Sequence, residues 1–178
     1  MSRATDLFRV CLRPVGSNLD EVALPACGIY RTTRTLHLGE HEVPANQLVY
    51  FHNHSDAGPP LLLAPASNEN NKWTFQERGH SIVDSEDIGA LASLKPEGFY
   101  RFREHFHPNE DQIVAANATV QLGYDRAASP LVFFPTVYLA DNSLRFPSNG
   151  MKIGDNLYEL LEPLDVRGPF VPKVRHLH

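Results

Sequence analysis

The stretch GFYRFREHFH, residues 98–107, follows the pattern of an earlier stretch, GIYRTTRTLH, residues 28–37. When residues 28–65 are aligned without gaps to residues 98–135, ten of the 38 positions are identical. About two identities would be expected by chance from ordinary residue frequencies. The identical pairs are Gly28/Gly98, Tyr30/Tyr100, Arg31/Arg101, His37/His107, Glu40/Glu110, Ala45/Ala115, Ala57/Ala127, Pro60/Pro130, Leu61/Leu131 and Pro65/Pro135. The sequence therefore predicts an internal duplication with a repeat of about 70 residues.

The correspondence continues toward the C-terminus after one inserted residue. Residues 72–82 resemble residues 143–153, and residues 84–94 resemble residues 154–164. Residues 168–178 (GPFVPKVRHLH) are an incomplete third copy of the opening stretch. This continuation extends the duplication over most of the chain.

These matches predict repeat 1 at residues 28–97 and repeat 2 at residues 98–178, with the strand at 98–107 shared between them. No Pro/Gly/Ser-rich linker separates the repeats, so we expect one compact domain over residues 1–178. A further strand is predicted at residues 6–14. It could pair with the C-terminal strand and cover an exposed sheet edge.

Each repeat is predicted to contain four strands, a short helix and a fifth strand. In repeat 1 the apolar stretches and turn residues place the strands at 27–38, 47–54, 59–65 and 72–82. The fourteen prolines and eleven glycines are spread along the chain, which favours short elements joined by turns. We therefore expect a mainly β protein.

The helices are expected directly after the fourth strand of each repeat. Asp84 can cap the first helix and Asp155 the second, and leucines at 157, 160, 161 and 164 recur at helical spacing in the second. Residues 108–117 could add one further helical turn. This order of elements resembles that of SH3-like and Sm-like small barrels. The resemblance implies two fused half-barrels, each with one short helix, and by itself implies no function.

Composition excludes some function classes. The formal net charge is −5, and only four of the sixteen cationic residues are lysines, so the composition argues against nucleic acid as a partner. No apolar run is long enough for a signal peptide or a membrane span, so we expect a cytoplasmic protein that does not cross a membrane. The two cysteines, Cys11 and Cys27, are expected to be free thiols in a reducing compartment.

The histidines suggest a metal-binding alternative. Residues two apart on a strand share a face, so His105 and His107 could bind one divalent transition metal together with Glu110. Gly98, His105, His107, Glu110 and Gly123 resemble the first motif of the cupins, which implies a metal-dependent enzyme. Repeat 1, however, has Thr35 in the place of His105.

Strand alternation favours a plainer interpretation of the same residues. It places Phe102 and Phe106 on the buried face, and Arg101, His105 and His107 on a polar, water-facing surface. The letters HLGEH, residues 37–41, match an inverted zincin pattern. That pattern needs a helix, and Gly39 and the strand signals around it argue against one.

The residues used twice are the candidate binding residues: Tyr30, Arg31 and His37, with Tyr100, Arg101 and His107. They either serve the fold alone or present arginine and aromatic groups to an extended ligand. No phosphate-binding glycine loop, dinucleotide fingerprint or Cys-x-x-Cys is present, which argues against catalysis and against a cofactor.

We therefore predict a non-catalytic protein- or peptide-binding or structural module. A homodimer could form through an exposed sheet edge. The first alternative is a metal-binding, cupin-like enzyme that uses His105, His107 and Glu110. A third and less favoured function is the binding of single-stranded RNA.

Overall fold

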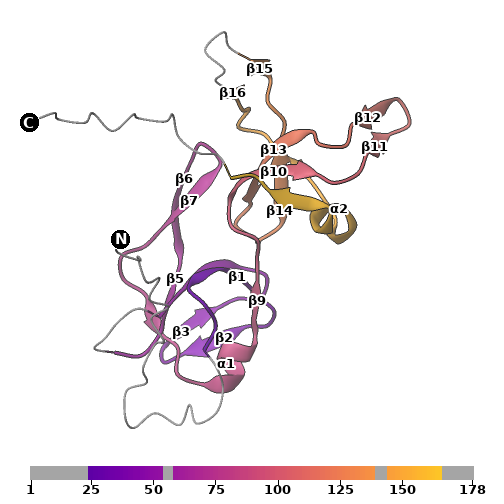
Figure 1. The fold of residues 1–178 in the computed structure, drawn as a ribbon. Coiled ribbons are helices and arrows are strands. Elements are labelled where there is room, and N and C mark those ends of the chain that lie inside the picture. Colours follow the sequence, from indigo (N-terminus) through magenta and orange to yellow (C-terminus); the bar gives the residue numbers. More distant parts are fainter. Residues whose placement is uncertain (1–23, 54–57, 139–143, 166–178) are drawn as a thin grey trace, which may run out of the picture. The chain divides into compact units, whose positions relative to one another are not determined.

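A computed structural model of the chain describes residues 24–53, 58–138 and 144–165 (Figure 1). The protein is mainly β, as predicted: its strands form antiparallel sheets, accompanied by two short helices. The strand predicted at 6–14, the third copy at 168–178 and Cys11 lie outside the described residues. Cys27 is a free thiol, and its Sγ accepts a hydrogen bond from the Asn53 amide at 3.0 Å.

The chain divides into two compact units. Among the described residues, unit 1 comprises those up to Glu69, Trp73–Pro96 and Tyr124–Ser129. Unit 2 comprises Asn70–Lys72, Glu97–Gly123 and the residues from Pro130 onward. Each unit therefore contains a segment that is distant in the sequence from the rest of it. The single compact domain stays a prediction.

Unit 1 is built on a five-stranded sheet with the order β8-β5-β4-β1-β9. Two hairpins, β2–β3 and β6–β7, and helix α1 complete it. The bounds are β1 Gly28–Thr32, β2 Leu36–Leu38, β3 His41–Val43, β4 Leu48–His52, β5 Leu61–Leu63, β6 Pro65–Glu69, β7 Lys72–Phe75, β8 His80–Ser81, α1 Ser85–Gly89 and β9 Leu91–Ser93.

Unit 2 is built on a five-stranded sheet with the order β17-β14-β13-β10-β18, again with two hairpins and a helix. Its elements therefore follow one another in the order seen in unit 1. The bounds are β10 Gly98–Phe102, β11 Phe106–Asn109, β12 Gln112–Val114, β13 Thr119–Tyr124, β14 Pro130–Phe133, β15 Val137–Tyr138, β16 Leu144–Arg145, β17 Met151–Lys152, α2 Asp155–Glu159 and β18 Leu161–Pro163.

The strand registers of the two sheets also correspond. Tyr30 lies opposite Ser93 and Val49 in sheet 1, and Tyr100 lies opposite Pro163 and Val120 in sheet 2. Corresponding residues differ by 70 in sequence number between β1 and β10 and between β9 and β18, and by 71 between β4 and β13. The extra residue lies in the hairpin, because Leu36 pairs with Val43 whereas Phe106 pairs with Val114.

The core of unit 1 is a cluster of buried apolar side chains from the sheet, hairpin β2–β3 and α1. Its buried members are Tyr30, Leu36, Leu38, Val49, Phe51, Leu62, Ile82, Ile88 and Ala90. Alternate residues of each strand point into it, as in a sheet with one covered face. The cluster shows that the hairpin and the helix cover the same face of the sheet.

Two glycines allow close packing at equivalent places. An ideal Cβ on Gly79 would lie 2.5 Å from the carbonyl oxygen of Leu62, and one on Gly150 would lie 2.7 Å from the Phe133 ring. Real Cβ atoms do not approach other atoms this closely. Gly79 therefore lets the chain just before edge strand β8 approach β5, and Gly150 lets the chain just before edge strand β17 approach β14.

The turn of hairpin β6–β7 belongs to unit 2. Asn70 and Asn71 both have positive φ, 53° and 64°, as a two-residue hairpin turn requires. The buried Asn71 side chain donates hydrogen bonds to Gln121 Oε1 and to the Pro147 carbonyl, both at 3.0 Å. Gln121 Nε2 in turn donates to the Asn70 carbonyl at 2.7 Å.

The loop after β13 belongs to unit 1. Ala128 is fully buried, and the Arg126 carbonyl accepts a hydrogen bond from the Leu48 amide at 3.0 Å. The Trp73 indole donates to the Tyr124 carbonyl at 2.7 Å, and the Arg126 guanidinium lies 5.1 Å from the centre of the Trp73 ring. This loop therefore completes the packing around β4 and β7.

The helices differ from the prediction in extent and capping. Asp84 caps α1 as predicted, because its carboxylate accepts a hydrogen bond from the Glu86 amide at 2.8 Å. The prediction for Asp155 was wrong: Gly154 is the N-cap of α2, and no side chain caps it. Each helix has five residues. Leu161 belongs to β18, so the leucine spacing did not describe one helix.

The helical turn expected at 108–117 was also wrong. Phe106–Asn109 and Gln112–Val114 are the two strands of a hairpin. In the part of the chain that the structure describes, no helix has the length and apolar character needed to span a bilayer.

Candidate binding residues

The two repeated tyrosines are core residues. Tyr30 is 6% exposed, its hydroxyl donates to the Ala26 carbonyl at 2.7 Å, and its ring meets Phe51 edge-on. Tyr100 is 3% exposed. Burial raises the pKa of both hydroxyls, that of Tyr100 to about 12. The rings therefore belong to the sheets' packing and do not form part of an exposed binding surface.

The repeated arginines lie at equivalent places but have different neighbours. Arg101 is exposed, and its Nη2 forms an ion pair with Glu162 on β18 at 2.9 Å, with a second hydrogen bond from Nε at 3.1 Å. Arg31 is half-buried, and Ala92 lies opposite it where Glu162 lies opposite Arg101. Both Arg101 nitrogens donate to one oxygen, Glu162 Oε2, and among the described residues this pair is specific to unit 2.

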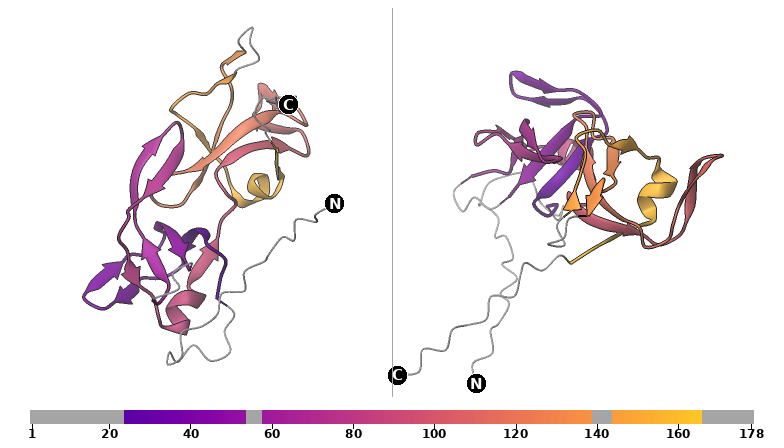
Figure 2. Two further views of the ribbon diagram at one scale, coloured as in Figure 1. Left: turned by 60° about the vertical axis from the view of Figure 1, so that its left-hand side comes forward. Right: turned by 90° about the horizontal axis from the view of Figure 1, so that it is seen from above.

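The repeated histidines are exposed on the first hairpin of each unit. His37 lies on β2 opposite Glu42, between the buried Leu36 and Leu38. His107 lies on β11 next to the buried Phe106. Each hairpin therefore buries one row of side chains and shows a polar row to solvent. Figure 2 shows both hairpins extending from the sheets of their own units.

The predicted metal ligands are not gathered into a cluster. The His105 and His107 rings are 6.2 Å apart and nearly perpendicular, and Glu110 is exposed at the hairpin turn. Within residues 24–53, 58–138 and 144–165, no group of three or more His, Cys, Asp or Glu residues is placed to hold a metal ion.

The HLGEH stretch forms a hairpin in the structure. Leu38 pairs directly with His41, and Gly39, with a φ of 67°, makes the turn. His37 and His41 therefore lie on different strands. A zincin-type helix would have to place both on one helical face.

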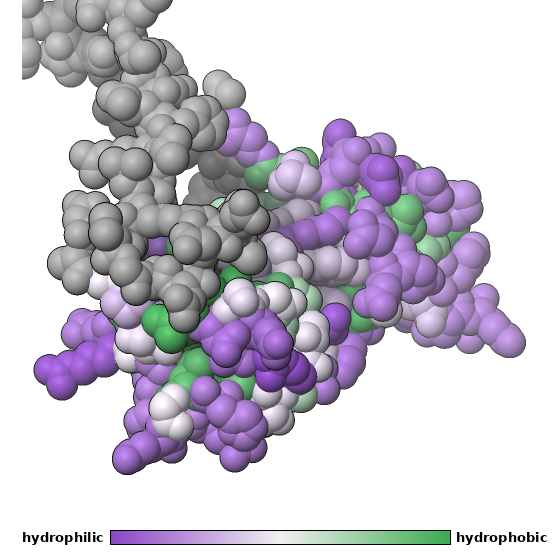
Figure 3. All heavy atoms as spheres, turned by 90° about the horizontal axis from the view of Figure 1, so that it is seen from below, coloured by the Kyte–Doolittle hydropathy of each residue, from purple (hydrophilic) through white to green (hydrophobic). Residues whose placement is uncertain are grey.

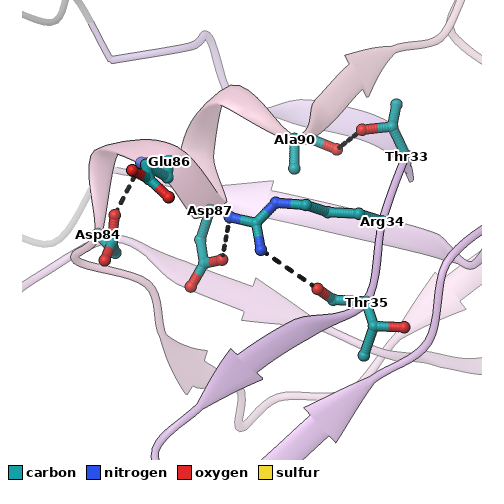
Figure 4. A network of polar contacts seen from close by, with 7 residues as sticks. All are labelled: Thr33, Arg34, Thr35, Asp84, Glu86, Asp87 and Ala90. Atoms are coloured by element: carbon teal, nitrogen blue, oxygen red, sulfur yellow. Dashed lines mark hydrogen bonds and ion pairs between the residues drawn. The ribbon is translucent and has the colours of Figure 1, made fainter.

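A charged network that the sequence did not predict joins α1 to the segment after β1 (Figure 4). Arg34 Nη2 forms an ion pair with the largely buried Asp87 at 2.8 Å, and Thr33 Oγ1 donates to the Ala90 carbonyl at 3.0 Å. The aligned positions in unit 2 are Glu104 and Leu157, so repeat matching gave no signal for this pair.

A second contact that the sequence did not predict joins two histidines. The rings of His41 on β3 and His80 on β8 lie with their centres 4.0 Å apart and their planes tilted by 36°. His80 follows His41 by 39 positions in the chain, and no motif connects them.

The surface offers few large apolar side chains. Among the described residues, only Val83 and Ile113 are exposed large hydrophobics, Ile113 at 63%. Hydrophilic residues predominate on the face drawn in Figure 3, with hydrophobic areas between them.

Comparison with protein-family models, with curated proteins and with solved structures gave no match.

Proposed function

We propose that the protein is a non-catalytic protein- or peptide-binding module of the cytoplasm, made by duplication of one SH3-like unit of about 70 residues. The main observation that supports this proposal is the pair of hairpins, β2–β3 and β11–β12. They occupy the same place in the element order and present His37 and His107 outward. Two similar polar surfaces on one chain suit a ligand that is bound at two points.

The duplication is supported by the equal strand orders and by matching backbone hydrogen bonds. The Thr33 amide donates to the Ala90 carbonyl, and the Arg103 amide donates to the Leu160 carbonyl, both at 2.9 Å. The turn residues Asn46 and Asn117 also match, with φ of 58° and 64°. Such agreement in detail is expected when both halves descend from one unit.

The SH3-like architecture is supported by the strand order alone. In sheet 1 the chain passes from β1 through the hairpin to β4, β5 and β8, and then through α1 to β9 on the other side of β1. This places the first strand between the second and the last. We assign the five strands predicted for repeat 1 to β1, β4, β5, β8 and β9, so the last of them lies at Leu91–Ser93 and not at the shared strand expected at 98–107.

The binding surface that we propose is the outer row of each hairpin. In unit 1 this row includes His37 and Glu42, which face each other across the strands. In unit 2 it includes His107 and Ile113, which are also exposed. The mixture of imidazole, carboxylate and one large apolar group favours a polar peptide with an apolar anchor.

A peptide-display selection on the full, untagged chain tests this function. Selected peptides are measured by fluorescence anisotropy against wild type, against a unit 1 variant with His37→Ser and Glu42→Ser, and against a unit 2 variant with His107→Ser and Ile113→Ser. We expect binding to weaken by about tenfold or more in at least one variant.

The matched control replaces exposed residues outside hairpins β2–β3 and β11–β12, Glu69→Ser with Lys152→Ser, and should change affinity less than about twofold, on the order of normal surface effects. Selection of no peptide, or of peptides that bind all variants equally, would reject the proposed surface. Circular dichroism confirms that each variant stays folded.

A further inference from the structure

The tip of hairpin β2–β3 faces the sheet edge of unit 1. Residues directly opposite each other in an antiparallel pair share a face. Leu38 and His41 are such a pair, and Leu38 is only 7% exposed within the core cluster. His41 is therefore directed toward the body of unit 1, while His37 and Glu42 share the other face.

His80 meets His41 from the edge of the sheet. It lies on β8, which among the described strands pairs only with β5, and the preceding Gly79 lets this strand approach β5 closely. The two rings are in contact, with centres 4.0 Å apart. His80 is half-buried and His41 is open to solvent, so an ion from water can reach the pair.

We propose that His41 and His80 together bind one divalent transition-metal ion, Zn²⁺, Ni²⁺ or Cu²⁺, and thereby fasten the hairpin tip to β8. Imidazole nitrogens are favoured ligands of these ions and poor ligands of Mg²⁺ or Ca²⁺. Two nitrogens at about 2.0–2.1 Å from one ion lie roughly 3 Å apart. The ring centres of two imidazoles that bind one ion lie roughly 5 Å apart, so the two rings must turn and separate by about 1 Å to bind it, and water fills the other positions.

The pair is particular to unit 1. In the registers of the two sheets, His80 lies opposite Leu62, and Met151 takes the corresponding place opposite Val132. The His-x-His pair of unit 2, with perpendicular rings 6.2 Å apart, lies on one segment, His105 just before β11 and His107 on it, so a metal bound there would not fasten a hairpin to the sheet edge. Metal binding at His41 and His80 does not depend on the proposed peptide-binding function.

Titration of the full, untagged chain with NiCl₂ or ZnCl₂ alone tests the site, with amide and imidazole NMR shifts and calorimetry as readouts. Four proteins are compared: wild type, His41→Asn, His80→Asn, and a control with His105→Asn and His107→Asn. We expect one saturable site whose shifts centre on β3 and β8. We expect it to weaken at least about tenfold in each of the two single variants and to persist in the control.

Three results would overturn the site. The first is that no saturable binding occurs at metal concentrations up to about 1 mM. The second is that either single variant binds the metal as tightly as wild type. The third is that only the control loses binding. The amide spectrum without metal shows whether each variant keeps the wild-type fold. A variant that loses it is replaced by His41→Gln or His80→Gln before the comparison is made.

Discussion

At the end of the first sheet strand, unit 1 buries Thr32 where unit 2 buries Phe102, and both side chains are fully buried. The backbones agree, because the amide of each residue donates to the carbonyl of the residue after the Asn turn. The Thr32 hydroxyl donates to the Pro44 carbonyl at 2.7 Å and accepts from the Gln47 amide at 2.9 Å.

Phe102 fills the same place by aromatic contact, with the Phe106 ring 4.6 Å away and the Phe134 ring 6.5 Å away. The difference teaches that one backbone frame accepts either a small hydrogen-bonded side chain or a large apolar one. This backbone arrangement requires only that the space at the strand end is filled and that buried polar groups have hydrogen-bond partners.

The largest expected effect is that of Phe102→Ala. Removing a fully buried ring should lower the free energy of unfolding by about 3–5 kcal/mol, because the cavity cannot fully collapse. Thr32→Val keeps the volume but leaves the Gln47 amide without the hydroxyl, and should cost about 1–3 kcal/mol. Urea unfolding followed by circular dichroism measures both. Equal losses would contradict the different roles assigned to the two positions.

The two close-packed glycines sharpen the comparison next. Gly79→Ala should cost about 1–3 kcal/mol, because the added methyl group meets the backbone carbonyl of Leu62, which is held in the sheet. Gly150→Ala meets the ring of the buried Phe133, and a side-chain ring shifts by a few tenths of an ångström more easily than sheet backbone does, so the loss should be smaller. Thermal unfolding of both variants is the measurement, and a larger loss at Gly150 would count against this explanation.

The core tyrosines predict a difference in alkali. Burial raises the pKa of Tyr100 from its ordinary value of 10.0 to about 12, so the folded state holds this proton more tightly than the unfolded state does. The resulting stability is complete below pH 10.0 and is lost as the pH rises toward about 12. Urea midpoints across this range should fall less in Tyr100→Phe than in wild type. An identical pH profile for the two proteins would contradict the shift.

The helix caps predict a smaller effect. Asp84→Ala removes a side-chain cap and should cost about 1 kcal/mol. Asp155→Ala removes only an acidic group from the first turn of α2, which is worth about 0.3–1 kcal/mol. Chemical unfolding of the two single variants and of the double variant gives both values. A larger loss for Asp155→Ala would show that α2 is capped after all.

The smallest effect belongs to the exposed pair of Arg101 and Glu162. Arg101→Ala should change stability by only about 0–1 kcal/mol, because water and salt screen this pair. Ala92→Glu gives Arg31 the partner that Arg101 has, and should stabilise by a comparable amount at low salt. A double-mutant cycle for each pair at low and high salt checks this, with salt-independent values as the contrary outcome.

The mainly β character could be predicted because strand alternation and turn residues are local signals. Along β10 and β11, Phe102 and Phe106 are buried and Arg101 and His107 are exposed, as strand alternation predicts. A fixed shift of 70 residues missed the equivalence of Asn46 and Asn117, because the second hairpin has one residue more. Insertions in turns change spacing without changing the sheet, so an ungapped match cannot follow them.

The errors arose where local spacing was ambiguous. Leu161 has helical spacing to Leu157, yet it pairs with Phe102 as part of β18 and is buried there. Tertiary strand pairing decided its state, and propensity did not. Asn109 and Gln112 are polar residues that suit a helical turn or a hairpin equally, and their cross-strand pairing placed them in a hairpin.

The candidate site was harder to predict than the fold. Identity between repeats selected Tyr30 and Tyr100, but a residue kept for packing and one kept for binding look alike in a single sequence. The contact of His41 with His80 depends on the hairpin folding back onto a distant edge strand. No spacing rule describes such a contact.

The placement of Tyr124–Ser129 in unit 1 bears on how the chain folds as it leaves the ribosome. Small tandem units often fold one after the other during synthesis, beginning at the N-terminus. Unit 1 lacks its buried Ala128 until residues 97–123 of unit 2 have also been made. We therefore expect nascent unit 1 to remain incomplete until translation has passed Ser129, so that the two units mature together.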